Sequence, residues 1–198
     1  MKRIIFMSLI CLLISFSSFA LTQNELVRIL QQPNSLQGNF EQQRFLQGMD
    51  TPFKLEGHFT LVKNKGLLWN MESPFKNAIR INQEGIKQWV NNHWQGENNI
   101  GQSSQVKLFL GILSGDLQSL SSQFTMQLQG DINNWQLTLT PNSLLMKQIF
   151  NKISLKGNNV VHQIQLNETQ GDRTIIQLSH IQINSPLNAF AQKALNQG

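Results

Sequence analysis

The side chains that most often carry chemistry are scattered along this chain. The four histidines lack the short spacing and the neighbouring carboxylates of a metal site: His58, His93, His162 and His180. The sequence therefore predicts no metal site and no cofactor. The run Gly111–Gly115 contains a serine, but it stands one position too late for the G-x-S-x-G turn of serine hydrolases. We expect a helix that ends at Gly115 instead.

The carboxylates form no pair suited to acid–base work. Four of them are expected on the solvent-facing sides of strands: Glu41, Glu56, Glu72 and Glu168. Charged residues make up 14% of the chain, and it contains no P-loop or dinucleotide fingerprint. These observations favour a binding protein with no catalytic residues, although a catalytic site assembled from distant residues stays open.

The N-terminus has the pattern of a secretory signal peptide. Lys2 and Arg3 precede an apolar run that reaches Ile14, and Ser18-Phe19-Ala20 is a small-x-small cleavage site. The run is shorter than the roughly 20 apolar residues of a transmembrane helix, which makes a retained anchor the weaker alternative. We expect residues 1–20 to be cleaved and residues 21–198 to form one exported domain.

The mature chain offers no thiol chemistry, because its single cysteine, Cys11, lies in the predicted signal peptide. The formal charge of +5 includes +2 from Lys2 and Arg3, and the remaining +3 is spread along the chain. Nucleic-acid binding gains no support from this distribution. A loosely basic surface could attract anionic lipid headgroups or an acidic partner, but an ordinary solvated surface is the favoured explanation.

Alternating apolar and polar residues predict a mainly β protein. Thr22 and Glu25 form a capping-box pattern that predicts a helix over Thr22–Gln32, and Leu187–Leu195 is a second candidate helix. Between them we expect about ten or eleven antiparallel strands, with helical segments at 104–122 and at Leu144–Phe150. The strands that the alternation predicts are Leu36–Leu46, Phe53–Lys63, Leu67–Glu72, Asn77–Asn82, Ile86–Asn91, segments beginning at Phe124 and at Trp135, Lys152–Lys156, Val160–Asn167 and Arg173–Ile183.

One face of this sheet carries a surplus of large apolar side chains, and so long an antiparallel sheet must curve to manage its edges. Covered by short helices, that face could be solid core or could enclose an apolar cavity, and composition leaves both open. The residues that we expect on it are Phe40, Leu55, Phe59, Leu61, Leu67, Trp69, Met71, Ile79, Ile81, Trp89, Phe124, Met126, Leu128, Trp135 and Leu137.

Three stretches in the first half of the chain form a recognisable series: Leu36-Gln37-Gly38-Asn39-Phe40-Glu41-Gln42, Phe53-Lys54-Leu55-Glu56-Gly57-His58-Phe59, and Gly66-Leu67-Leu68-Trp69 followed by Pro74. In order and spacing they resemble the LolA-like outer-membrane lipoprotein carriers. The resemblance weakens beyond Trp89 and returns at Gly171-Asp172-Arg173-Thr174, as in a divergent member of the family.

The resemblance implies a periplasmic monomer with a curved antiparallel half-barrel whose concave face, covered by lid helices, holds the acyl chains of a lipoprotein or lipid cargo. It also implies an inner-membrane donor complex and an outer-membrane acceptor. The family's latch arginine corresponds to Lys63 here, and lysine lacks the planar fork of arginine. The predicted lid residues are Val106, Phe109, Leu110, Leu113, Leu145 and Ile149.

Two other functions stay open at this stage. One is a periplasmic sensor or interaction module on the same scaffold, although such proteins carry a further domain. The other is a lipid-modifying enzyme, for which His162 and Arg44 are the candidate polar groups.

Overall fold

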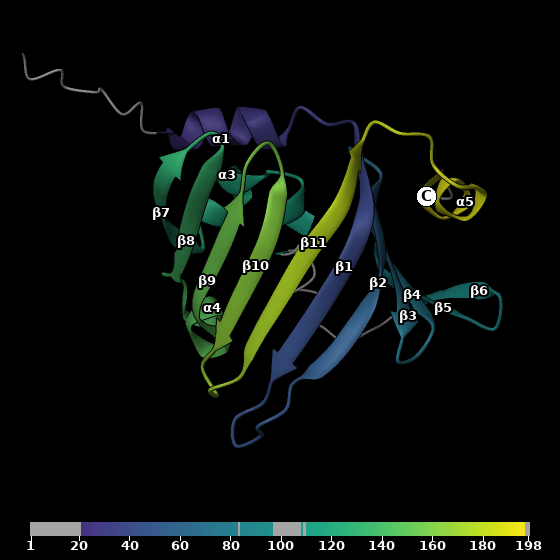
Figure 1. The fold of residues 1–198 in the computed structure, drawn as a ribbon, viewed down its shortest axis with the longest axis horizontal. Helices are drawn as coiled ribbons and strands as arrows, with labels where there is room; N and C mark the ends of the chain where they lie inside the picture. Colours follow the sequence, from purple (N-terminus) through teal and green to yellow (C-terminus); the bar gives the residue numbers. More distant parts are fainter. Residues whose placement is uncertain (1–20, 83, 97–107, 109, 197–198) are drawn as a thin grey trace, which may run out of the picture.

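The computed structural model describes residues 21–82, 84–96, 108 and 110–196. In this part of the chain eleven antiparallel strands form one curved sheet, in the order β6-β5-β4-β3-β2-β1-β11-β10-β9-β8-β7 (Figure 1). The two end strands of this order, β6 and β7, do not pair with each other, so the sheet is a half-barrel rather than a closed barrel. The predicted fold class is confirmed.

The strands and helices alternate along the chain much as the sequence predicts. The strands are β1 Ser35–Phe45, β2 Phe53–Val62, β3 Gly66–Ser73, β4 Asn77–Asn82, β5 Gly85–Val90, β6 His93–Gly96, β7 Phe124–Asp131, β8 Asn134–Pro141, β9 Phe150–Gly157, β10 Val161–Glu168 and β11 Arg173–Ile183. The helices are α1 Gln23–Leu30, α3 Leu117–Ser121, α4 Leu144–Ile149 and α5 Ala189–Asn196, and residues 108 and 110–113 are also helical.

The first strand and the last strand lie side by side in the middle of the sheet. β1 pairs with β11 from Leu36 opposite Ile183 to Phe45 opposite Arg173, and it pairs with β2 on its other edge. Because successive strands run in opposite directions, the short turns between paired neighbours fall alternately on two rims of the half-barrel. We call them the α1 rim, with α1 and the β2–β3, β7–β8 and β9–β10 turns, and the α4 rim, with α4, the β1–β2 loop, and the β3–β4 and β10–β11 turns.

Helix α1 begins where the capping box predicts. The Thr22 hydroxyl accepts from the Glu25 backbone N–H at 3.3 Å, and the Thr22 N–H donates to the Glu25 carboxylate at 2.8 Å. Hydrogen bonds from the Thr22 hydroxyl and then from its N–H hold the pKa of Glu25 below its ordinary value. Leu26 and Leu30 lie on the buried side of the helix, which attaches it to the sheet.

The structure adds one strand to the prediction, moves one helix–strand boundary and bears out one helix break. Strand β6 was not predicted, because its four residues are too few to display alternation. Phe150 begins β9 instead of ending α4. As expected, the helical pattern over 104–122 breaks at Ser114 and Gly115, where φ of Gly115 is +69°, and a second helix, α3, follows with Asp116 as its N-cap. The predicted end of the helix at Gly115 is confirmed.

Helix α5 covers part of the convex face, outside β3 and β4 (Figure 1). Arg80 on β4 is 3% exposed beneath it and donates to the Ala194 carbonyl of the last helical turn at 2.9 Å. A cation at that end stabilises a helix, because the carbonyl dipoles point there. The Arg80 guanidinium also lies 5.1 Å from the ring centroid of Trp94. The sequence analysis did not single out this arginine.

Among the described residues, none of the helices combines the length and the apolarity needed to cross a bilayer. The predicted signal peptide and Cys11 lie outside the described residues.

Candidate functional site

The concave face of β1 to β3 is lined by a group of aromatic rings. Phe40 on β1 stacks on Trp69 of β3 with ring centroids 3.8 Å apart, and Phe59 of β2 lies 6.3 Å from the same tryptophan. Gly57 of β2 pairs with Phe40 and has no side chain, which leaves room for the two rings to meet across β2. A Cβ atom at Gly57 would lie 2.0 Å from the Asn70 carbonyl oxygen, so only glycine fits.

Beside these rings the concave face contains a cavity of about 200 Å³. One wall is apolar and comes from β3 and β4, with Leu67, Trp69, Ile79 and Ile81. The opposite wall comes from β1, β9, β10 and β11. Its members are Gln42, Arg44, Phe150, Leu166, Glu168, Thr174 and Ile176. The cavity is therefore an apolar slot with a small number of polar groups near one end, as in sites for amphiphilic ligands.

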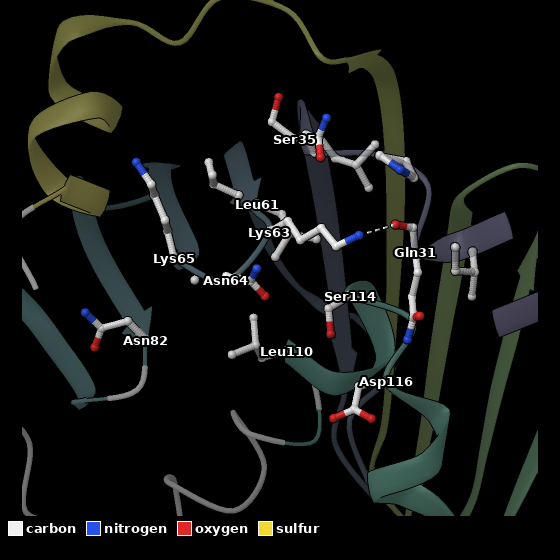
Figure 2. Close-up of a pocket in the computed structure, with 16 residues that line it drawn as sticks. Gln31, Ser35, Leu61, Lys63, Asn64, Lys65, Asn82, Leu110, Ser114 and Asp116 are labelled. Atoms are coloured by element: carbon white, nitrogen blue, oxygen red, sulfur yellow. Dashed lines mark hydrogen bonds between the residues drawn. The ribbon is translucent and has the colours of Figure 1, made fainter. Parts of the chain in front are cut away.

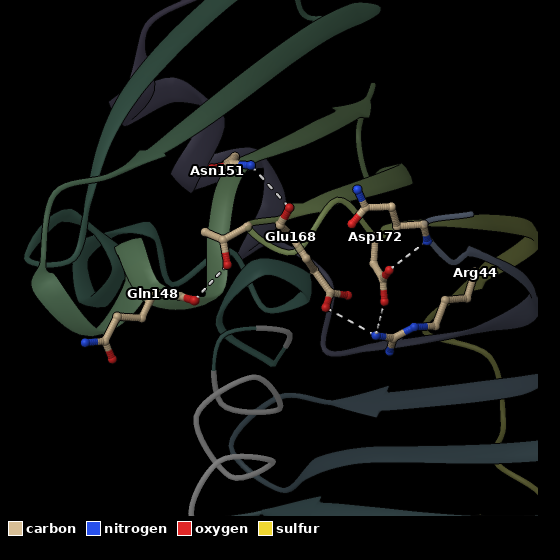
Figure 3. Close-up of polar contacts among 7 residues, drawn as sticks. Arg44, Gln148, Asn151, Glu168 and Asp172 are labelled. Atoms are coloured by element: carbon tan, nitrogen blue, oxygen red, sulfur yellow. Dashed lines mark hydrogen bonds and ion pairs between the residues drawn. The ribbon is translucent and has the colours of Figure 1, made fainter. Parts of the chain in front are cut away.

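The polar end of the slot is an ion-pair network toward the α4 rim (Figure 3). Arg44 Nη2 lies 3.2 Å from a Glu168 oxygen and 3.1 Å from an Asp172 oxygen. The backbone N–H of Gln47 donates to the other Asp172 oxygen at 3.0 Å. This hydrogen bond first, and the one from Arg44 second, hold the pKa of Asp172 below its ordinary value. The lowered pKa keeps the Asp172 carboxylate ionised at neutral pH.

A larger cavity of about 480 Å³ opens at the α1 rim (Figure 2). Its apolar wall includes Leu30, Leu36, Leu61 and Leu110. Lys63 extends across it, and its ammonium group donates to the Gln31 carbonyl at the C-terminal cap of α1, at 2.9 Å. The predicted latch residue thus connects the end of β2 to α1. Lys65, which also lines this cavity, donates a hydrogen bond to the side chain of Asn196, the last residue of α5.

Farther along the sheet, the concave face over β8 and the middle of β9 is filled by side chains. Trp135, Leu137, Ile153 and Leu155 are completely buried there. Ile112 belongs to the same buried cluster, together with leucines of the covering segment (residues 108 and 110–113) and of α3: Leu108, Leu113, Leu117 and Leu120. Both alternatives for the apolar face are therefore realised, because one part is solid core and another keeps a hollow.

The predicted cavity residues divide between these environments. Leu61 lines the larger cavity, and Leu67, Trp69, Ile79 and Ile81 line the smaller one. The remaining concave residues belong to the same apolar cluster without lining either cavity: Phe40, Leu55, Phe59, Met71, Phe124, Met126, Leu128, Trp135 and Leu137.

Trp89 is the exception, because it lies on the convex face. It packs in the cluster beneath α5, 5.0 Å from the Trp94 ring and 5.6 Å from the Phe190 ring. On β5 its neighbour Gln88 pairs with the inward-facing Ile79, so Trp89 must point outward. Its assignment to the cavity is corrected.

Two of the predicted lid residues, Val106 and Phe109, lie outside the described residues. Leu110 lines the larger cavity and Leu113 is buried against the sheet. Ile149 is partly buried, but Leu145 is 53% exposed and points away from the cavity. In a helix as short as α4 one stripe faces inward, and Met146 with Ile149 provides it, which corrects the placement of Leu145.

The structure does not assemble the polar groups of an enzyme from the residues proposed for one. Arg44 lies near the α4 rim in the network described above, whereas His162 lies near the α1 rim, where Nε2 contacts Asn158 Oδ1 at 2.9 Å. Ser114 donates to the Gly111 carbonyl at 3.3 Å, within its own helical turn. Across the described ranges, no three histidine or acidic side chains are grouped as metal ligands would be.

Sequence comparison identifies the fold family directly. Residues 31–191 match the family model described as outer membrane lipoprotein carrier protein LolA. The chain belongs to the LolA family. The matched range contains every strand of the sheet and all the residues that line the smaller cavity. LolA-family proteins are extracytoplasmic binding proteins rather than enzymes.

Solved structures agree with this fold. MucB has a TM-score of 0.53 at 12% identity, over 89% of this chain and 62% of the MucB chain. For the Pseudomonas aeruginosa MucA/MucB complex the TM-score is 0.50 and the sequence identity 13%, over 85% of this chain and 58% of that one. For a DUF1329 family protein from Desulfovibrio piger the TM-score is 0.50 and the sequence identity 12%, over 87% of this chain and 97% of that one. This chain thus spans about three fifths of the MucB chains. No curated protein sequence matches it significantly.

Several site residues escaped the sequence analysis. Glu168 was expected on a solvated exterior, but it lies on the cavity wall with only 17% of its side chain exposed. The alternation of the strand could have placed it, because Ile164, Leu166 and Glu168 are two residues apart on β10 and therefore share a face. Gln42 follows Phe40 on β1 in the same way, as does Arg44, which the sequence analysis named only as a candidate group for an enzyme.

Proposed function

We propose that this LolA-family protein is a periplasmic carrier. It shields the acyl chains of a lipoprotein or lipid against its concave face and moves the cargo from the inner to the outer membrane. The observation that carries this proposal is the uneven filling of the half-barrel: an apolar hollow separates β3 and β4 from the facing wall of β1 and β9 to β11, while the concave face over β8 is packed solid. Membership of the LolA family supports it.

The physical need for a carrier is large. Exposing about 15 methylenes of an acyl chain to water costs on the order of 12 kcal/mol. Apolar walls such as Trp69 and Ile79 recover part of this energy without requiring a specific headgroup. A hollow with few polar groups therefore suits a carrier that must also release its cargo.

Uptake of a whole chain requires the covering helices to move. The hollow of about 200 Å³ is smaller than the roughly 300–1,000 Å³ of typical ligand sites. Leu110 and Ile112 belong to the segment that covers the concave face beside it. Displacement of this segment joins the hollow to the cavity of about 480 Å³ at the α1 rim.

Lys63 is suited to control this movement as the latch. Its single hydrogen bond to Gln31 holds α1 against the β2–β3 turn, beside Leu110 of the covering segment. A lysine makes a weaker and less directional tie than the arginine fork of the family, which eases opening. Residues 1–20 direct export, and residues 21–198 form the single carrier domain.

Native mass spectrometry of protein purified from the periplasm without detergent tests the carrier function. We expect a bound species whose mass corresponds to an acyl lipid or a lipid-modified protein, and solvent extraction should release it. Protein that carries no acylated species, and that takes none up from lipid micelles, would overturn the proposal.

A further inference from the structure

The exposed large apolar side chains of this protein gather on one rim. Eight such side chains are exposed among the residues that the structure describes, and five of them lie on the α4 rim, between 48% and 83% exposed. They come from the β1–β2 loop and the start of β2, from the β3–β4 turn, and from α4. The five are Met49, Phe53, Phe75, Leu144 and Leu145.

Three segments project these apolar side chains from the rim: the β1–β2 loop with the start of β2, the β3–β4 turn, and α4. Each of these projections also carries an exposed lysine. Lys54 follows Phe53, Lys76 follows Phe75, and Lys147 lies three residues beyond Leu144 on α4. Exposed apolar side chains with lysines nearby are suited to the surface of an anionic bilayer, where an apolar region lies beneath charged headgroups. The apolar groups enter the headgroup–acyl boundary, while the ammonium groups bind lipid phosphates.

The rim is held in place by hydrogen bonds that run across three connections (Figure 3). The Thr169 hydroxyl of the β10–β11 turn donates to the Gln148 carbonyl of α4 at 2.8 Å, and the Asn151 side chain donates to the Glu168 carbonyl at 3.2 Å. Arg44 and the Gln47 N–H then bind Asp172 of the same turn from the β1 side. The projections on α4 and on the β1–β2 loop are therefore fixed relative to each other.

We infer that the α4 rim docks on the surface of an anionic phospholipid bilayer. Phe75 and Leu144 lead the contact, since they are 80% and 83% exposed. The polar end of the concave hollow, at Arg44 and Glu168, lies toward the same rim, so docking places the hollow beside the lipid surface. This surface is independent of whether the hollow carries cargo.

Vesicle co-sedimentation tests the inference with a matched pair of double variants. Phe75→Ser/Leu144→Ser removes apolar groups from the α4 rim, and Ile132→Ser/Ile183→Ser removes two 47% exposed apolar groups on the opposite rim. Vesicles of phosphatidylethanolamine with phosphatidylglycerol are compared with vesicles of phosphatidylcholine alone. Circular dichroism and the thermal midpoint establish that both variants are folded.

We expect wild type and the Ile132/Ile183 variant to bind the anionic vesicles equally and the Phe75/Leu144 variant to bind at least ten-fold more weakly. Binding to phosphatidylcholine alone should be weak, and added salt should lower binding to the anionic vesicles. Three results would overturn the inference: no binding by wild type, equal losses in both variants, or equal binding to both vesicle types. The first would leave the exposed rim to a protein partner. Cargo binding, measured separately in solution, tells failure of docking from failure of the carrier function.

Discussion

Trp135 and Trp69 lie on the same concave face but in different surroundings. Trp135 of β8 is completely buried, and its indole N–H donates to the Asn158 carbonyl. Trp69 of β3 forms a wall of the hollow and stacks on Phe40. Similar residues thus serve different purposes in the two parts of the sheet, because Trp135 is enclosed by packed side chains while Trp69 borders a hollow. An apolar face therefore does not by itself identify a binding site, because other side chains can fill the space against it.

The largest expected effect is on the filled part of the sheet. Trp135→Ala should lower the free energy of unfolding by about 3–5 kcal/mol, because a fully enclosed ring is replaced by a void. Chemical denaturation monitored by circular dichroism measures the change. Trp94→Ala, at a partly exposed site on the convex face, is the control and should cost clearly less. Equal losses would mean that the β8 region is not the better-packed one.

A second pair compares the two parts at aliphatic positions. Leu137→Ala, at a fully buried site, should cost about 2–5 kcal/mol. Ile79→Ala should cost less than about 2 kcal/mol, because its side chain already borders a hollow and has fewer contacts to lose. The same denaturation experiment measures both. If Ile79→Ala proved as costly as Leu137→Ala, the hollow would not exist in solution.

The latch should affect kinetics more than stability. Lys63→Ala removes one exposed hydrogen bond to Gln31, which contributes about 0.5–1 kcal/mol, and it should raise the release rate of a fluorescent fatty acid severalfold. Lys65→Ala, on the same cavity but bonded to Asn196, is the matched control. Stopped-flow dilution measures the rates. Equal release from both variants would remove the latch from the account.

The smallest expected effect concerns acid stability at the polar end of the hollow. Because the pKa of Asp172 is lower in the folded state than in the unfolded chain, its contribution is complete above its unfolded pKa of about 4. It is lost as the pH falls through the lower folded value. The thermal midpoint of wild type should therefore fall more steeply below about pH 4 than that of Asp172→Asn. Parallel pH profiles for the two proteins would contradict the ion-pair geometry.

Alternation predicted most of this fold because β2 and its neighbours bury one face and expose the other. The sequence could also place Gly57, Phe59 and Trp69 on one face, since strand period and turn positions agree there. What alternation alone could not decide was how much of that face the helices fill. That depends on tertiary packing by residues such as Ile112, far away in the sequence.

Trp89 and Glu168 were predicted on the wrong face of the sheet because hydrophobicity or charge was given more weight than the alternation of side chains along the strand. Ile86 and Trp89 are three apart on one strand, so they lie on opposite faces, and only Ile86 pairs with the inward-facing Ile81. Glu168 was judged by its charge, although it shares a face with Leu166. Arg80 was overlooked because a buried arginine depends on a partner, Ala194, that only the folded chain brings near.

The central claim is that the hollow over β3 and β4 binds an acyl chain. Titration of the purified protein with a dansyl-labelled fatty acid tests it most directly, with Ile79→Trp to fill the hollow and Ile183→Trp on the exposed end of β11 as control. The account predicts saturable binding with a blue-shifted emission in wild type and in the control, and at least ten-fold weaker binding in Ile79→Trp. Unchanged binding by a folded Ile79→Trp protein would contradict it.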